Sequence, residues 1–207
     1  MEQSINSVIL RGSLLALPEL AHENHGRKFY RFYLEVPRLS GAVDILPVVT
    51  EERNLNQLDL SGGSMLTVRG QVRSHNIRTD GKRRLLIFVF AGSVMTEDGE
   101  PINQVTLAGP LCKEPTYRRT PLGREICDVM LAVPRAFRRA DYLPCILWGR
   151  TAQELSVCHT RDRIRINGRL QSRIYTKVTE GGPQERTAYE ISALTAEILE
   201  DQIQHQT

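Results

Sequence analysis

The strongest constraint on the fold of this chain is an internal repeat at a spacing of 97 residues. The matched pairs are Asn6 and Asn103, Gly12 and Gly109, Gly26 and Gly123, the Val-Pro-Arg segments 36–38 and 133–135, and Asp44, Leu46 and Pro47 with Asp141, Leu143 and Pro144. After a one-residue slip, Gly70 and Ser74 match Gly168 and Ser172. Length alone leaves open one larger domain or two small ones in 207 residues. A register kept through strands and turns predicts two units of the same fold.

A short acidic and turn-prone stretch separates the two units. It reads Thr96-Glu97-Asp98-Gly99-Glu100-Pro101, a composition typical of a connection between domains. We therefore expect a first domain at residues 1–96, a linker at 97–101 and a second domain at 102–207.

The order of elements is clearest in the second unit. Apolar alternation and turn residues predict strands at 105–112, 124–133, 141–148, 163–175 and 188–198, with a short helix at 151–157. We expect an all-β chain of two tandem five-stranded OB-fold Greek-key barrels, each with one short helix between strands 3 and 4. Glycines inside the strand patterns, such as Gly70 and Gly168, predict bulges or tight barrel corners.

The composition indicates an ordinary globular protein. It is 41% apolar and 25% charged, and it has no run of about 18 apolar residues that could span a bilayer. The N-terminus lacks the basic and apolar regions of a signal peptide, so we expect a cytoplasmic protein without a membrane partner.

Neither a metal site, a cofactor nor catalysis is expected. The four cysteines, Cys112, Cys127, Cys145 and Cys158, are more than ten residues apart and form no C-x-x-C pair. No G-x-S-x-G, Walker-type, H-E-x-x-H or paired-carboxylate arrangement is present, and the five histidines are scattered. We predict that the protein is not an enzyme.

Charge is distributed unevenly between the halves. Residues 1–100 carry 12 Lys and Arg against 12 Asp and Glu, whereas residues 101–207 carry 15 against 12, which accounts for the net charge of +3. Such an excess suggests an anionic partner for the second half, although a solvated strand face is the plainer alternative.

Several short motifs occur in the second half in a fixed order. They are Asn-Gln-Val-Thr-Leu-Ala-Gly at 103–109, Leu-Cys-Lys-Glu-Pro at 111–115, Thr-Pro-Leu-Gly at 120–123, Leu-Ala-Val at 131–133, Trp-Gly-Arg-Thr-Ala at 148–152 and Asn-Gly-Arg-Leu-Gln-Ser-Arg at 167–173. In this set the second half resembles the bacterial single-stranded DNA-binding protein family over about 95 residues. The first half looks like the same fold with its motifs eroded.

The resemblance implies non-catalytic binding of single-stranded DNA by base stacking and phosphate contacts, in replication, repair or recombination. By similarity, the stacking rings are Phe137, Tyr142, Trp148 and Tyr175. The surrounding cations expected at phosphates are Arg118, Arg119, Arg135, Arg138, Arg139, Arg150, Arg169, Arg173 and Lys177. Aromatic rings interleaved with cations suit sequence-tolerant binding of single strands. Trp148 could instead be a core or interface residue, and individual arginines could be solvated.

The repeat places Ile45, Glu51 and Ile77 where the second half has Tyr142, Trp148 and Tyr175. The first half is therefore expected to bind poorly. A basic cluster at Arg78 and 82–84, flanking a predicted turn at Asp80-Gly81, could grip phosphates or guard an edge strand.

The resemblance also bears on partners. Two barrels in one chain suggest a homo-oligomer, possibly a dimer of tandem barrels. No acidic recruiting tail is seen at residues 200–207, so recruitment of repair enzymes through such a tail is not expected. The alternative function is a primosome-like adaptor whose barrels chiefly bind protein, which weak salt dependence of DNA binding would favour.

Overall fold

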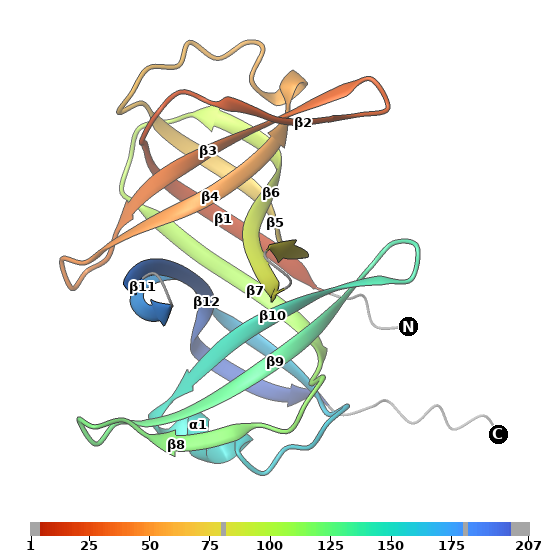
Figure 1. The fold of residues 1–207 in the computed structure, drawn as a ribbon, viewed down its shortest axis with the longest axis vertical. Coiled ribbons are helices and arrows are strands. Elements are labelled where there is room, and N and C mark those ends of the chain that lie inside the picture. The colour runs from red at the N-terminus through yellow and green to blue at the C-terminus, as the bar shows by residue number, and fades with distance from the viewer. Residues whose placement is uncertain (1–4, 80–81, 180–181, 200–207) are drawn as a thin grey trace.

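The computed structural model describes residues 5–79, 82–179 and 182–199, and these residues lie almost entirely in β-strands (Figure 1). The first half contains β1 (Asn6–Leu14), β2 (Glu19–Asn24), β3 (Arg27–Pro37), β4 (Val43–Glu51), the 3-10 turn η1 (Glu52–Asn54), β5 (Met65–Thr79) and β6 (Lys82–Thr96). The second half contains β7 (Ile102–Pro110), β8 (Thr116–Arg119), β9 (Glu125–Arg135), β10 (Arg139–Trp148), α1 (Gly149–Leu155), β11 (Arg163–Thr179) and β12 (Gly182–Leu199). The predicted turn at Asp80-Gly81 and the segment 200–207 lie outside the described residues.

Each half is a closed barrel, which confirms the predicted OB-type fold. In the first, β1 pairs with β3 and β5, β3 with β4, β5 with β6, and a short parallel pairing of β4 with β6 closes the barrel. In the second, β7 pairs with β11, β11 with β12 and β9 with β10, and β10 lies parallel to β12. The expected helix is α1 in the second barrel and only the single turn η1 in the first.

The barrels form because alternate strand residues are buried. In β9, the side chains of Cys127, Val129, Leu131 and Val133 point into the core, and each is at most 2% exposed. Their neighbours along the strand point to the outside, as the period of two residues requires. A similar alternation in β3, β4 and β10 gives each barrel an outer face of exposed and half-buried side chains.

Gly70 on β5 and Gly168 on β11 each lie at a β-bulge, as predicted from their places inside strand patterns, with the extra residue on the partner strand β6 or β12. A Cβ on Gly70 would lie 2.2 Å from the carbonyl oxygen of Phe90, and one on Gly168 would lie 2.3 Å from that of Ser192. Only glycine permits this approach, which bends the hairpin at the corner of the barrel.

The two barrels share one continuous sheet. β1 pairs antiparallel with β7, from Asn6 opposite Leu107 to Arg11 opposite Ile102, so that all twelve strands form a single hydrogen-bonded series. The two barrels lie on opposite sides of this seam (Figure 1). The amide of Asn6, for example, bridges the backbone of Val72, and that of Asn103 bridges the backbone of Leu170.

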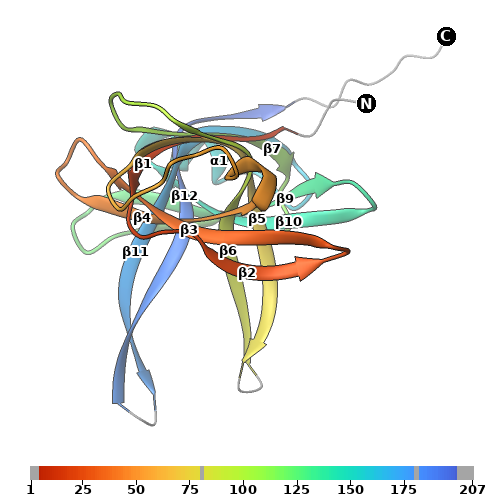
Figure 2. The ribbon, with the colours of Figure 1, turned by 90° about the horizontal axis from the view of Figure 1, so that it is seen from above.

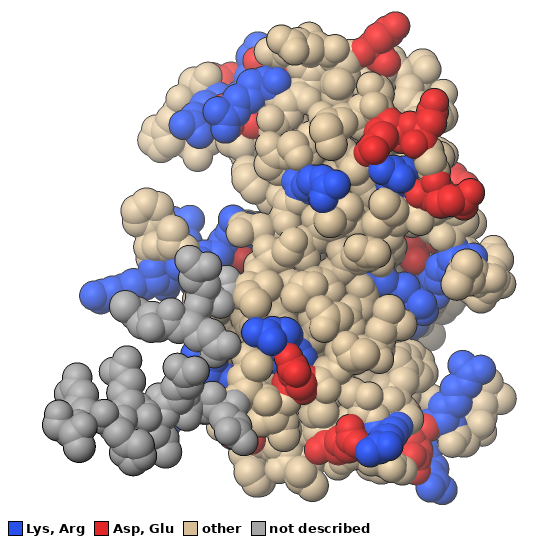
Figure 3. All heavy atoms as spheres, turned by 180° about the vertical axis from the view of Figure 1, so that it is seen from behind, with Lys and Arg blue, Asp and Glu red and all other residues tan. Residues whose placement is uncertain are grey.

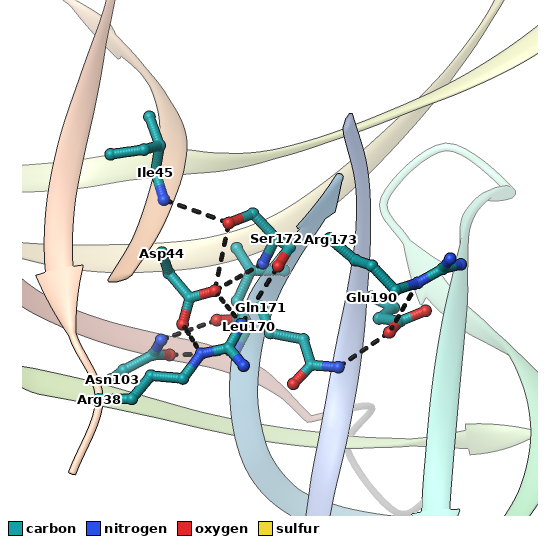
Figure 4. Close-up of polar contacts among 9 residues, drawn as sticks. All are labelled: Arg38, Asp44, Ile45, Asn103, Leu170, Gln171, Ser172, Arg173 and Glu190. Carbon is teal, nitrogen blue, oxygen red and sulfur yellow. Dashed lines mark hydrogen bonds and ion pairs between the residues drawn. The ribbon is translucent and has the colours of Figure 1, made fainter. Parts of the chain in front are cut away.

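Two buried aspartates, one in each barrel, form hydrogen bonds with the other barrel. Asp44 accepts hydrogen bonds from the backbone N–H of Ser172 at 2.7 Å and from two nitrogens of Arg38 (Figure 4). The repeat-related Asp141 accepts from the backbone N–H of Ser74, also at 2.7 Å. Both aspartates are fully buried, so these contacts hold the barrels in one relative orientation.

The hairpins β5–β6 and β11–β12 extend beyond their barrels and project from the same side of the molecule (Figure 2). Their long strands, Met65–Thr79 with Lys82–Thr96 and Arg163–Thr179 with Gly182–Leu199, are paired over most of their length. The space between the hairpins is the place where the two outer faces approach each other. No helix in the described part of the chain is long and apolar enough to cross a membrane.

Candidate nucleic-acid interface

A groove of about 1700 Å³ lies between the two barrels on the side of the hairpins. Both halves of the chain line it. Its cationic side chains are Arg31, Arg73, Arg84, Arg135, Arg139, Lys177 and Arg186, and its aromatic ones are Tyr33, Phe88, Phe90, Tyr175 and Tyr189. Glu185 is the carboxylate among the described lining residues. A groove of this composition attracts a polyanion and offers flat rings to it.

Three of the four predicted rings lie on strands of the second barrel. Tyr142 and Trp148 point to the same side of β10, and Tyr175 lies on the extended part of β11. Tyr142 is 45% exposed and Tyr175 is 37% exposed, which leaves ring surface for a stacked base. The guanidinium carbon of Arg173 lies 5.7 Å from the centre of the Tyr175 ring, a cation–π distance.

Trp148 is half-buried and held in place. Its indole Nε1–H donates to Ser192 Oγ at 3.1 Å, and its backbone begins α1. This contact gives the ring a structural role and fixes its orientation, while part of its surface remains accessible. The hydrogen bond to Ser192 supports the structural interpretation of Trp148, and its role in stacking stays a prediction.

Phe137 lies apart from the other rings, in the turn between β9 and β10. Its side chain is 93% exposed, and both Phe137 and Arg138 adopt positive φ angles, 59° and 53°. The turn conformation holds the ring in solvent, where it covers no core residue.

Many of the predicted cations are already paired with carboxylates. The ion pairs are Arg118 with Asp128 at 2.7 Å, Arg119 with Glu125 at 3.0 Å, Arg135 with Asp141 at 3.3 Å, Arg150 with Glu154 at 2.7 Å and Arg173 with Glu190 at 3.8 Å. The hydrogen bond to Asp128 raises the pKa of Arg118, and the one from Arg119 lowers the pKa of Glu125. These arginines stay charged, but their fields are partly offset.

A second group of predicted cations has no carboxylate within ion-pair distance among the described residues: Arg138, Arg139, Arg169 and Lys177. Arg139 on β10 and Lys177 on β11 both line the groove. Arg169 is half-buried with its Nε atom out of contact with water. Arg139 and Lys177 are thus the cations best placed to meet a phosphate in the groove.

Sequence comparison missed the first-barrel wall of the groove. Arg73, His75, Phe88 and Phe90 lie on the outward side of β5 and β6, opposite Tyr175 and Lys177. The signal was present, because Phe88 and Phe90 alternate with the buried Ile87 and Val89 and so must point outward. Arg73 also reaches Asp141 at 3.5 Å, and burial lowers its pKa.

The opposite face of the molecule differs from the groove. Seen from behind, its Lys and Arg side chains are scattered and interspersed with acidic and uncharged surface (Figure 3). No group of three His, Cys, Asp or Glu side chains that could hold a metal occurs in residues 5–79, 82–179 and 182–199. Cys127, Cys145 and Cys158 are buried free thiols, and Cys112 is exposed.

Comparison with known families gives a match to the second barrel. The sequence profile of the single-strand binding protein family matches residues 102–199. Single-stranded DNA-binding protein B of Bacillus subtilis is 39% identical over 80 residues, which are 35% of this chain and 71% of that protein. Single-stranded DNA-binding protein 1 of Staphylococcus aureus is 37% identical over 81 residues, 36% of this chain and 48% of that protein. The match thus spans 71% of the first of these relatives and 48% of the second.

Comparison with solved structures covers both barrels. A deletion mutant of the single-stranded DNA binding protein from Thermus aquaticus superimposes with a TM-score of 0.81 over 100% of both chains, at 23% identity. The wild-type protein gives a TM-score of 0.79 over 96% of this chain and 95% of that one. At this identity the likeness establishes the fold, including the arrangement of two barrels in one chain.

Proposed function

Since this chain belongs to the single-strand binding protein family, we propose that it binds single-stranded DNA without catalysing a reaction, chiefly through the outer face of its second barrel. The observation that carries the proposal is the position of Tyr142 and Tyr175. Both rings are more than a third exposed on the barrel that matches the family. Each stacked base contributes about 1–3 kcal/mol and requires an accessible ring of this kind.

The proposed site consists of the rings Phe137, Tyr142, Trp148 and Tyr175 with the cations around them. Tyr175 lies at the groove, Tyr142 and Trp148 lie further along the same outer face, and Phe137 lies beyond them in the β9–β10 turn. Arg139 and Lys177 would contact phosphates first. The ion-paired arginines, such as Arg118 and Arg173, would contact phosphates only in competition with their carboxylates.

The site suits a single strand better than a duplex. Stacking needs exposed base faces, which a duplex hides, and no helix in the described residues is long enough to read a major groove. We propose that the protein acts where single strands are exposed, in replication, repair or recombination, and that it assembles into homo-oligomers. No observation favours the adaptor alternative over this function.

The test is a titration of the full chain with oligo-dT, followed by the fluorescence of Trp148, the sole tryptophan. We expect tight binding at low salt and a logarithm of the affinity that falls linearly with the logarithm of salt concentration, because phosphates that bind the protein release their counterions. A duplex of equal length is the control. Equal affinity for duplex and single strand, or affinity independent of salt, would overturn the proposal.

A further inference from the structure

The first barrel carries an aromatic stack that the repeat comparison does not reveal. The ring of His22 lies parallel to that of Phe29, with centroids 4.7 Å apart and planes 7° apart. Phe29 in turn contacts Phe90 at 6.1 Å between centroids. The guanidinium carbon of Arg73 lies 5.7 Å from the centre of the Phe90 ring. Three rings and one cation therefore form a continuous series on the outer surface.

Four different strands supply this series. His22 on β2 is opposite Phe29 on β3, Phe90 is on β6, and Arg73 is on β5. Arg73 and Phe90 point away from the core, because their strand neighbours Val72 and Val89 are buried in it. Phe29 lies on the face of β3 opposite the buried Phe32, and every residue of β2, including His22, is exposed. Phe29 and Phe90 are half-buried, and His22 is exposed at the open end of the stack.

The stack lies where the second barrel has Trp148. Phe29 is directly opposite Glu51, which is the repeat counterpart of Trp148. Phe90 on β6 is opposite Gln71 on β5, and Ser192 on β12 is opposite Arg169, the repeat counterpart of Gln71. Phe90 therefore occupies the position equivalent to Ser192, which accepts the hydrogen bond from Trp148. The first barrel thus has no ring on β4 at the Trp148 position, but Phe29 on β3 and Phe90 on β6 lie beside that position.

The charges around the stack favour an anion. Glu51, the carboxylate nearest this position, is paired with Arg53 at 3.1 Å and with Arg27 at 3.8 Å. Arg31 and Arg73 also line the groove beside the stack, where Arg31 is only loosely paired with Glu19 at 3.9 Å and Arg73 lies 3.5 Å from Asp141. The unfavourable effect of Glu51 on phosphates is therefore offset within the barrel itself.

The stack opens into the same groove as the second-barrel site. His22, Arg73 and Phe90 line the groove from one side, and Arg139, Tyr175 and Lys177 line it from the other. A strand stacked on Tyr175 would meet the first-barrel rings without leaving the groove.

We propose that His22, Phe29 and Phe90 form a second base-stacking site, and that one DNA strand crosses the groove from Tyr175 to this stack. The proposal rests on the proposed function, because it places the same ligand on the first barrel. Arg73 holds the Phe90 ring and meets the phosphate between the two sites. The strand stacks on the exposed His22 end and on the free surface of the Phe29–Phe90 pair.

The experiment uses the full chain with Phe29→Leu and Phe90→Leu, which keep most of the apolar volume but remove the ring face. Tyr30→Leu is the matched control, because Tyr30 adjoins Phe29 on β3 but donates its hydroxyl to Glu52 instead of joining the stack. We expect each phenylalanine variant to bind a long oligo-dT at least about fivefold more weakly, the lower limit for one stacked base. Tyr30→Leu should bind as the unaltered chain does.

A second measurement on the unaltered chain covers the case in which a leucine variant does not fold. Diethylpyrocarbonate modifies exposed histidines, and saturating oligo-dT should protect His22. His159, which is exposed and contacts Glu114 at 3.2 Å far from the groove, should stay reactive. Unchanged reactivity of His22, or unchanged affinity of both folded leucine variants, overturns the second site.

The outcomes separate this proposal from the proposed function. If Tyr175→Ala weakens binding while both leucine variants bind normally, the second site is wrong and the function stands. If the unaltered chain does not bind oligo-dT, both fail.

Discussion

The outer faces of the two barrels carry similar side chains on different strands. In the second barrel the rings stand on β10 and β11, at Tyr142, Trp148 and Tyr175. In the first, those positions hold Ile45, Glu51 and Ile77, and the rings stand on β3 and β6. The fold, the bulges and the aspartate contacts between barrels are shared. A barrel can therefore keep an aromatic outer face while losing every ring at its original position.

The largest expected effect concerns the two carboxylates that join the barrels. Asp141→Ala should destabilise the protein by about 3–5 kcal/mol, because it leaves Arg73 and Arg135 close together without their shared partner. Asp44→Ala should cost less within that range, since only one arginine, Arg38, loses its ion-pair partner. Urea unfolding measures both, with the exposed Asp59→Ala as control. A cost for Asp44→Ala above that for Asp141→Ala would contradict this account of the junction.

The bulge glycines should behave alike in the two barrels. Gly70→Ala and Gly168→Ala should each destabilise the protein by about 1–3 kcal/mol or more, because the added Cβ meets a carbonyl oxygen at 2.2 or 2.3 Å. Gly92→Ala on β6 is the matched control, with its nearest contact at 3.9 Å. Thermal unfolding of the three variants checks the prediction, and a tolerated Gly168→Ala would show that the corner does not need the bulge.

These comparisons show which features of the fold are predictable from sequence. Strands such as β9 and β10 could be predicted because buried and exposed residues alternate along them. The hairpin strand β2 could not, because all six of its residues are exposed and leave no apolar pattern. The pairing of β1 with β7 could not be predicted either, since nothing in a single strand specifies its neighbour across a domain boundary.

The candidate site likewise contains residues that the sequence pointed to and residues that it did not. The rings of the second barrel were predicted because the resemblance assigns roles position by position. The stack in the first barrel was missed because its ring Phe29 is on β3, opposite Glu51 on β4. Which residues lie opposite each other depends on strand register, and the sequence repeat does not reveal it.

The next prediction compares equivalent positions on β5 and β11. Tyr175→Ala should weaken binding of oligo-dT by about 5- to 150-fold, the effect of losing one stacked base. Ile77→Ala, at the counterpart position, should change affinity little and act on packing. Salt-matched titrations of both full-length variants measure the difference. Equal losses would mean that the two hairpins contribute to binding in the same way, against the comparison drawn above.

The smallest expected effect distinguishes paired from unpaired cations. Lys177→Ala should reduce the slope of log affinity against log salt by about one, as expected for one lost phosphate contact. Arg118→Ala should reduce the slope less, because Asp128 already lies 2.7 Å from its guanidinium. Titrations over a series of salt concentrations give both slopes. A larger reduction for Arg118→Ala would show that its ion pair opens on binding.

The central claim is that one strand of DNA lies across the outer faces of both barrels. Ultraviolet crosslinking of the unaltered chain to an oligonucleotide containing 5-bromodeoxyuridine, with peptides identified by mass spectrometry, tests it directly. The account predicts crosslinks at Tyr142, Trp148 or Tyr175 on the second barrel and at His22, Phe29 or Phe90 on the first. Crosslinks confined to one barrel, or to residues outside these two faces, would contradict it.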